Sequence, residues 1–562
     1  MVYLEGNEKT DRTRIWREFY HVRQAHKGIK AASCIYIDVS INVNMIMIKQ
    51  MKSLLKKLIL LTIIFAFIGS CSFQPKNSNN SSAHNTIAGC ISQKEAIERK
   101  VQLETGIRGQ VKFVGESENF SSIVSKMSDY NIPALSLAVI HQGKIEWADI
   151  YQNVKFYDTQ KLNCNSVFQA ASLSKPVTFL AALRMHSAGE IDLDKNIQVY
   201  LKEFVLPSGK QTAQNPVTFR NIFSHTSGIT PGGYQGYTRN SNMPSDLEIL
   251  RGGEGVNTPA IEVSTPPNET LAYSGGAYTL AELALQDLYN DEFSNIMKKW
   301  ILEPAGMNHS EFTQPFSSSK PNQVAKGYTQ SGEVIDGGWN NYPQQAAAGL
   351  WSNSIDMAKF LIEVYKAYQG KSTIFSQSDI KSIISHERDG QVYGFILNRS
   401  GDDISLTHYG GNVGYRTGMT ISLTTGNGLV YLINSDNGVA LGNELLLSAS
   451  QVYNWQHFKQ TESERKQIRL EVLKELPGKY KWNNQIDLSI TFNDNDNLIS
   501  LYFPNGDEYK LVPIVGNEDK LEFINPNTGV KAAFSIKDEY QSFALYGQTA
   551  VKLQSSTNAS NK

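Results

Sequence analysis

Stretches of apolar and β-branched residues predict β-strands at both ends of a long central segment. Ala134–Ile140 and Lys144–Ile150 lie on either side of a Gln-Gly turn and predict a hairpin. Thr417–Leu423 and Leu429–Asn434 flank a Thr-Gly-Asn-Gly turn and predict a second hairpin. Helical patterns fall between them, at Ser172–His186, Tyr278–Leu288 and Ser354–Tyr368. This order predicts an α+β domain over residues 119–458, whose antiparallel sheet joins the two ends of the segment.

The last part of the chain has a different pattern, with short alternating strands at nearly even spacing. Leu488, Ile490 and Phe492 fall on one face of the first of them. Further strands are predicted at Ile499–Phe503, Tyr509–Val512, Lys520–Ile524, Lys531–Ile536 and Ser542–Tyr546. They predict a separate small antiparallel β-barrel, or a sandwich, over residues 476–562. The charged stretch Glu462–Lys474 predicts a linker helix between the two domains, assigned to residues 459–475.

The apolar run Leu58–Ile68 is too short for a membrane-spanning helix, which needs about 20 residues. It follows lysines and ends in Ile68-Gly69-Ser70-Cys71, which is the order of a secretory signal peptide. That ending resembles the lipobox of bacterial lipoproteins, whose cysteine is lipidated. Residues 51–70 are therefore expected to be a lipoprotein signal peptide, with Cys71 as the lipidated residue. The protein is then exported and anchored by lipid to a bacterial membrane, on its periplasmic or cell-surface side; the alternative is an ordinary buried helix.

A signal peptide acts at the N-terminus of a chain, so residues 1–50 are expected to be a non-native leader. Synthesis is then expected to begin at Met51, or at Met45 or Met47. Residues 71–118 are expected to form a tether and an N-terminal extension, because Lys76–Ala83 is rich in Asn and Ser.

Two cysteines remain for the folded part, Cys90 and Cys164. An exported protein lies in a compartment that permits disulfides, so these two cysteines can form a bridge. The alternative is two buried, inert thiols.

Charge is balanced, with 53 Lys and Arg against 54 Asp and Glu, and no long basic run occurs. This excludes the electrostatic pattern of a nucleic-acid-binding protein and favours a small molecule or a cell-wall component as the partner. The sequence also has no Cys or His cluster at zinc spacing and no phosphate-cradling glycine loop. We therefore expect neither a metal nor an organic cofactor.

Ser172 and Lys175 are candidate catalytic residues because they lie three positions apart at the start of a predicted helix. Residues at this spacing share a helix face, so the Lys175 amine can reach the Ser172 hydroxyl and act as its base. The pattern alone is unspecific, since it also begins at Ser53, Ser317, Ser378 and Ser463. Only Ser172 precedes Pro176 and an almost wholly apolar helix, which puts it near a helix N-terminus that favours negative charge. The alternative is that Ser172 is an ordinary helix N-cap.

Several ordered blocks resemble the serine β-lactamase-related hydrolases, a family of class C β-lactamases, DD-peptidases, D-aminopeptidases and esterases. The blocks are Ala170–Pro176, Gly189–Asp194, Phe223–Ile229, Ala272–Gly275, Ala348–Ser352 and His408–Gly411. The resemblance spans about 123–455 and implies an antiparallel sheet with flanking helices and a helical subdomain. Some family members also carry a lipocalin-like β domain, which the C-terminal segment resembles in its strand rhythm.

The resemblance implies a role for each matching residue. Ser172 would attack a carbonyl and form an acyl-enzyme, Lys175 would help to deprotonate it, and Tyr273 would relay protons to the leaving group. The backbone N–H groups of Ser172 and Gly411 would form the oxyanion hole, and Gly410 and Gly411 would let the strand edge approach the substrate. His408 would line the pocket, donate a hydrogen bond and carry a pH-dependent charge. For Tyr273 and His408 the alternative is a structural side chain.

Two departures limit what the resemblance implies. Gly275 replaces the Asn of the Tyr-x-Asn block, and His408 replaces the lysine of Lys-Thr-Gly. Both weaken the case for a dedicated β-lactamase. We therefore expect a serine hydrolase that cleaves an ester or amide bond through Ser172. The alternatives are a DD-peptidase, a D-aminopeptidase or a β-lactamase acting on cell-wall peptides or β-lactams, and a non-catalytic penicillin-binding-like protein.

Two further features are interpreted as structural or open. His225 is expected to be structural rather than catalytic, although it belongs to one of the blocks. Pro231–Tyr237, rich in glycine and tyrosine, is either a pocket rim or a plain surface loop.

Overall fold

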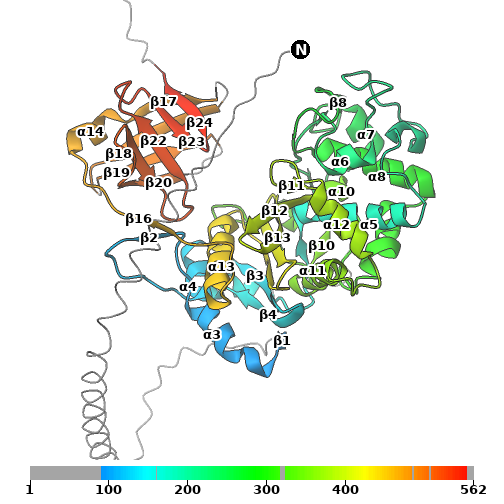
Figure 1. Ribbon diagram of the computed structural model, residues 1–562, viewed down its shortest axis with the longest axis horizontal. Helices are drawn as coiled ribbons and strands as arrows, with labels where there is room; N and C mark the ends of the chain where they lie inside the picture. Colours follow the sequence, from blue (N-terminus) through cyan, green and yellow to red (C-terminus); the bar gives the residue numbers. More distant parts are fainter. Residues whose placement is uncertain are drawn as a thin grey trace, which may run out of the picture. The chain divides into compact units, whose positions relative to one another are not determined.

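A computed structural model describes residues 90–159, 161–316, 323–483, 486–495, 497–504 and 508–553 (Figure 1). The chain divides into two units, Met1–Asn85 and Thr86–Lys562, and every described residue belongs to the second. The expected leader, signal peptide, lipidated Cys71 and most of the tether lie outside the described residues. Within the described ranges, no helix is long and apolar enough to cross a membrane.

An eight-stranded sheet forms the centre of the hydrolase-like region, and all its neighbouring strands are antiparallel. In spatial order its strands are β1 (Ile91–Ser92), β4 (Lys144–Gln152), β3 (Ala134–His141), β15 (Gly428–Ile433), β14 (Tyr415–Ser422), β13 (Asp403–Asn412), β12 (Phe395–Ser400) and β11 (Gln391–Val392). Strand β15 pairs with β3, with Leu429 opposite Val139. The two predicted hairpins are therefore adjacent, which confirms the predicted α+β sheet joining the two ends of the segment.

The alternation along the strands separates two apolar cores. In β3, Leu135, Leu137 and Val139 face a core that includes α13 (Gly438–Val452) and α3 (Ile97–Thr105). The residues between them face the larger core, where α11 (Ser354–Tyr368) packs on β3, β4, β14 and β15. Side chains of a strand point alternately to its two faces, so one sheet holds helices on both sides (Figure 1).

A group of helices beside the sheet carries the segments that matter for chemistry. Its members include α5 (Ser174–Ser187), α6 (Phe219–Phe223), α7 (Asp246–Arg251), α8 (Gly275–Tyr289), α9 (Phe293–Met297), α10 (Gln345–Ala348) and α12 (Gln377–Ser385). Helix α5 is buried along most of its length, as its apolar sequence predicts. The short helix α10 contacts both α5 and α8. This packing brings three segments that are distant in sequence to one place.

The C-terminal region is a closed antiparallel barrel of eight strands, which confirms the prediction of a barrel (Figure 1). They are β17 (Gly478–Trp482), β18 (Ile486–Asn493), β19 (Leu498–Tyr502), β20 (Glu508–Ile514), β21 (Lys520–Ile524), β22 (Lys531–Ser535), β23 (Ser542–Leu545) and β24 (Gln548–Lys552). Leu488, Ile490 and Leu501 point into an apolar interior. No strand was predicted at β17 or β24, whose pairing with each other closes the barrel.

The predicted linker helix at 459–475 is largely wrong. Thr461–Ser463 forms a strand, β16, which pairs in parallel with β2 (Val111–Phe113), and only Leu470–Glu475 is helical, as α14. Residues 461–467 are all polar, so a helix there would have no apolar face to bury, and short helices without such packing are marginal in water.

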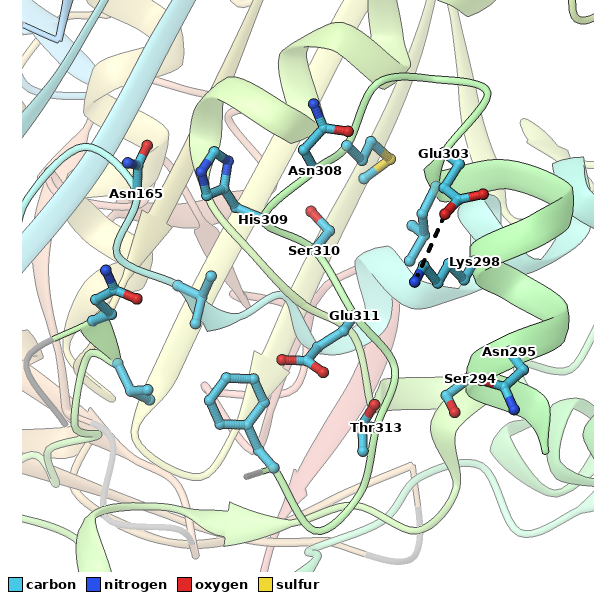
Figure 2. A pocket seen from close by; sticks show the side chains of 16 residues that line it. Asn165, Ser294, Asn295, Lys298, Glu303, Asn308, His309, Ser310, Glu311 and Thr313 are labelled. Carbon is cyan, nitrogen blue, oxygen red and sulfur yellow. Dashed lines mark ion pairs between the residues drawn. The ribbon is translucent and has the colours of Figure 1, made fainter. Parts of the chain in front are cut away.

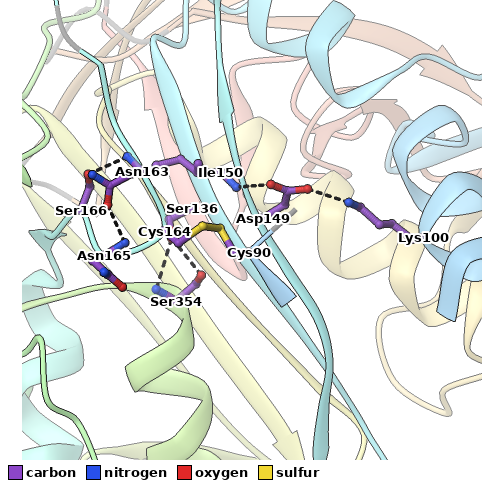
Figure 3. The surroundings of a disulfide bond; sticks show 10 residues. All are labelled: Cys90, Lys100, Ser136, Asp149, Ile150, Asn163, Cys164, Asn165, Ser166 and Ser354. Carbon is purple, nitrogen blue, oxygen red and sulfur yellow. Dashed lines mark hydrogen bonds and ion pairs between the residues drawn. A yellow bond between two sulfur atoms is a disulfide. The ribbon is translucent and has the colours of Figure 1, made fainter. Parts of the chain in front are cut away.

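Cys90 and Cys164 form a disulfide with a Cα–Cα distance of 5.4 Å (Figure 3). Cys90 directly precedes β1, and Cys164 lies in a turn where the Asn163 backbone N–H donates to Ser166 Oγ. The bridge therefore ties the edge strand β1 to the segment that leads into the Ser172 turn.

Candidate active site

Ser172 lies in a tight turn directly before helix α5. The turn is a 3-10 helix, Ala171–Leu173, and Ala171 has a left-handed φ of 52°, which is uncommon for a residue other than glycine. Ser174 Oγ donates to the Ala171 carbonyl at 2.6 Å and accepts from the Leu350 N–H at 3.0 Å. These bonds hold the turn in place, and Ser172 remains partly exposed while its neighbours are buried.

Lys175 reaches Ser172 as its spacing predicts. Its Nζ lies 3.4 Å from Ser172 Oγ and donates to the Ala347 carbonyl at 2.8 Å. The residue is 2% exposed, so bulk water has little access to it. A lysine amine held beside the Ser172 hydroxyl is placed to act as its base.

The short helix α10 positions Lys175 from the opposite side. Its Ala347 carbonyl accepts from Lys175, and its Ala346 N–H donates to Glu282 Oε2 of α8 at 2.8 Å. Asn412 Nδ2, at the end of β13, donates to the Ala348 carbonyl at 3.1 Å. This support has no signal in the sequence, because every residue carries a backbone carbonyl.

Tyr273 lies next to Lys175, just before the N-terminus of α8. The Lys175 Nζ is 4.6 Å from the centroid of its ring, which is a cation–π distance. Its neighbour Ser274 caps α8 by accepting the Ala277 N–H at 2.9 Å. Tyr273 is 47% exposed, so its hydroxyl is on a side chain that substrate can reach.

His225 lies beneath Tyr273, with ring centroids 4.5 Å apart. It is buried, its Nδ1 accepts the Ser274 N–H at 3.2 Å, and its Nε2 has no partner among the described residues. Burial, with Lys175 and His408 nearby, holds the pKa of His225 well below its usual value. Its contacts are those of a neutral side chain that supports Tyr273.

Strand β13 presents His408, Gly410 and Asn412 to the Ser172 side of the sheet. A Cβ added at Gly410 would lie 3.0 Å from Ser172 N and 2.8 Å from the Ala170 carbonyl oxygen. The position therefore has no room for a side chain, which is the physical reason for glycine. Gly411 takes the alternate orientation, toward Arg416, with which it pairs on β14.

The surroundings of His408 disfavour its charged form. His408 is 6% exposed, and burial together with the nearby Lys175 lowers its pKa to about 3. It is therefore neutral near pH 7, and it does not supply the positive field for Tyr273 that a protonated histidine would. Its Nδ1 is buried and has no partner in the part of the chain that the structure describes.

The Ser172 site lies outside the two described cavities. The first, of about 600 Å³, is lined by residues such as His309, Ser310 and Glu311 (Figure 2). Its Ser310 Oγ donates to Asp356 Oδ2 at 3.1 Å, and the other oxygen of that carboxylate is already paired with Lys359. In the described ranges, no three His, Cys, Asp or Glu side chains form a candidate metal site.

The fold and this arrangement define a class of protein, the β-lactamase-fold serine hydrolases. The profile of the Beta-lactamase family matches residues 120–451, and the chain belongs to that family. This confirms the resemblance drawn from the ordered sequence blocks.

Individual relatives are distant. The chain is similar to "Penicillin-binding protein 4*" of Bacillus subtilis, with 22% identity over 72% of this chain and 90% of that protein. It is 23% identical to "Unguisins hydrolase ungD" of Aspergillus violaceofuscus over 41% of this chain, and it spans only 42% of that relative's length. The structure of the octameric penicillin-binding protein homologue from Pyrococcus abyssi has the same fold, with a TM-score of 0.52 and 21% identity, covering 76% of this chain and 98% of that one.

Proposed function

We propose that this protein is a serine hydrolase that cleaves an ester or amide bond through an acyl-enzyme on Ser172. The observation that carries the proposal is the placement of Lys175 Nζ between Ser172 Oγ, at 3.4 Å, and the Ala347 carbonyl, at 2.8 Å. The carbonyl fixes the amine beside the hydroxyl, which is the arrangement that activates a weak nucleophile.

The reaction proceeds in two halves. In the first, Ser172 Oγ attacks the substrate carbonyl, and its proton passes to the neutral amine of Lys175. The backbone N–H groups of Ser172 and Gly411 stabilise the negative oxygen of the tetrahedral intermediate. The bond to the leaving group then breaks, and that group takes the proton from Lys175 through the Tyr273 hydroxyl. In the second half, water attacks the acyl carbonyl and gives one proton to Lys175 through the Tyr273 hydroxyl. The bond between the acyl group and Ser172 Oγ then breaks, Ser172 Oγ takes that proton, and the acid product leaves.

A second candidate is a DD-peptidase or D-aminopeptidase acting on cell-wall peptides. It is supported by the similarity to Penicillin-binding protein 4* over most of that protein's length. Action on β-lactams has less support, because His408 is neutral where a fixed positive charge would hold a substrate carboxylate. A binding protein without turnover is the remaining alternative, and Gly275 is the departure that favours it.

A fluorophosphonate probe tests the nucleophile. The wild-type protein should be labelled, and Ser172→Ala should abolish labelling. Ser378→Ala is the matched control, because Ser378 also begins a Ser-x-x-Lys pattern but lies exposed on α12. An unlabelled wild type would favour the binding protein. Acyl ester, cephalosporin and D-Ala-D-Ala substrates tested side by side then separate the hydrolase alternatives.

We also propose that Cys71 carries lipid and anchors the protein to a membrane. The support is the order of lysines, apolar run and Ile-Gly-Ser-Cys in residues 51–71. A clickable palmitate analogue should label the protein in bacterial cells, and Cys71→Ser should remove the label and shift the protein out of the detergent phase. Equal labelling of the wild type and of Cys71→Ser would contradict the lipid anchor at Cys71.

A further inference from the structure

We propose that Tyr234 forms an apolar wall of the active site, and that it selects substrates whose acyl group is uncharged and has no hydrogen-bonding group beside the scissile carbonyl. The inference rests on the proposed function and adds a substrate class to it. It gives a role to the glycine- and tyrosine-rich stretch Pro231–Tyr237, which the sequence left open between a pocket rim and a surface loop.

The ring of Tyr234 fills the space beside Gly275. A Cβ added at Gly275 would lie 2.8 and 3.1 Å from two ring carbons of Tyr234, and 3.2 Å from the Gly232 carbonyl oxygen. Gly275 is two residues beyond Tyr273, so this ring stands where a residue 275 side chain would. The replacement of the family's Asn by Gly275 is therefore matched by an aromatic ring from another segment.

The polar groups of this wall already have partners. The Gly275 N–H donates to the Gly232 carbonyl at 2.8 Å, and the Gly276 N–H donates to the Pro231 carbonyl at 3.0 Å. The Tyr234 hydroxyl is 2.8 Å from Thr279 Oγ1. The half-buried ring thus offers carbon to a substrate, and a polar group pressed against it would lose water without gaining a hydrogen bond.

The stretch that carries Tyr234 is fastened at its other end. The Gln235 carbonyl accepts from Tyr342 Oη at 3.1 Å and from Asn340 Nδ2 at 3.0 Å. The Gly236 carbonyl accepts from Asn257 Nδ2 at 2.6 Å. Bonds on both sides of Tyr234 hold its ring in one position, which is what a selective wall needs.

The charges around Ser172 agree with an uncharged acyl group. His408 has a pKa of about 3, and the pKa of His225 is also well below its usual value. Among the side chains described above as forming the site, Lys175 alone can carry a positive charge, and it is bound to the Ala347 carbonyl. A carboxylate on the acyl group would find no further cation among these residues.

Two p-nitrophenyl esters that differ by one group test the wall. The 3-phenylpropanoyl ester lacks the acylamino group of the N-acetylphenylalanyl ester, which is tested as each enantiomer. We expect the wild type to prefer the first in kcat/KM by about tenfold or more. Tyr234→Ala opens the space beside Gly275 and should lower that ratio about tenfold, and Tyr234→Ala with Gly275→Asn should lower it further.

The controls separate this inference from the proposed function. Tyr234→Phe keeps the ring, and Gly233→Ala adds a methyl group to the same stretch where nothing lies within 4 Å, so both should keep the wild-type ratio. Tyr234→Leu replaces Tyr234→Ala if the latter does not fold.

Each protein is also labelled with the fluorophosphonate probe. An unlabelled wild type would overturn the proposed function and this inference together. Labelling combined with a wild-type preference for the acylamino ester, or with an unchanged ratio in the Tyr234 variants, would overturn the inference alone.

Discussion

The surroundings of Ser172 and the interior of the C-terminal barrel are both buried, but they are filled differently. Around Ser172, several buried polar atoms have no partner among the described residues: His225 Nε2, His408 Nδ1, Glu282 Oε1 and both amide atoms of Gln344. In the described part of the barrel, Asp538 Oδ1 is the one such atom. The barrel interior is lined by apolar side chains such as Phe523, Phe534 and Phe543.

This difference indicates where the molecule gives up stability for chemistry. A buried polar atom without a partner costs free energy, and natural proteins keep such atoms mainly where function requires them. The barrel has the composition of a core selected for packing. The Ser172 region keeps a lysine, two histidines and a carboxyl group in the same low-dielectric space.

The largest expected effect concerns the buried lysine. Lys175→Met keeps an unbranched side chain one atom shorter but removes the base, so kcat/KM for an ester substrate should fall about 10²–10⁴-fold. The fold should persist, because Met suits a buried position. Initial rates and circular dichroism test this pair of expectations. Full turnover in the variant would exclude Lys175 from the proton path.

A cavity in the barrel should lower the stability of the protein and leave its turnover almost unchanged. Phe534 is fully buried against Tyr480, Phe523 and Phe543, so Phe534→Ala should lower the free energy of unfolding by about 3–5 kcal/mol. Ester hydrolysis below the unfolding temperature should change less than about twofold, because no proposed catalytic group lies in the barrel. Thr549→Ala, on an exposed position of β24, is the control. Denaturant titration measures the stability, and initial rates measure the turnover. A loss of turnover in the folded variant would contradict the assignment of the barrel to stability alone.

The disulfide tests whether the Ser172 region depends on covalent support. Cys90 and Cys164 enclose a long loop, with a sequence separation of 74, so Cys90→Ser with Cys164→Ser should cost about 2–4 kcal/mol of stability. Thermal unfolding of the variant and of the oxidised and reduced wild type checks the value. If reduction lowers the stability of the double variant as much as that of the wild type, the effect does not come from this bridge.

The smallest expected effect is the dependence of stability on pH from His408. Its pKa is about 3 in the folded protein and near 6.5 when unfolded, so below about pH 6.5 the unfolded chain binds a proton that the folded protein does not. Stability is therefore lost as the pH falls. Between pH 7 and pH 5 the wild type should lose about 2 kcal/mol of unfolding free energy that His408→Asn does not lose. Denaturant titrations at pH 7 and pH 5 measure the free energies of unfolding of both proteins. If the variant differs from the wild type by the same amount at both pH values, the neutral state of buried His408 is contradicted.

The sequence predicted the elements better than their partners. The hairpins, three of the four long helices and six of the eight barrel strands carry local patterns, whereas α13, β17 and β24 were missed and the polar linker was assigned too much helix. In the site, the contact of Lys175 with Ser172 follows from helical spacing. The contact of Tyr234 with Gly275 joins two separate segments, and a neutral His408 depends on every group that excludes water from it.

The sequence by itself determined the strand and helix periodicity, the α+β order and the serine–lysine pair, because these depend on residues close together along the chain. Only the tertiary structure decided what surrounds that pair. It brought the Ala347 carbonyl to Lys175 across 172 positions of sequence, and it placed the Tyr234 ring beside Gly275. Both result from packing between distant segments, and packing also sets the burial that fixes the charge of each side chain.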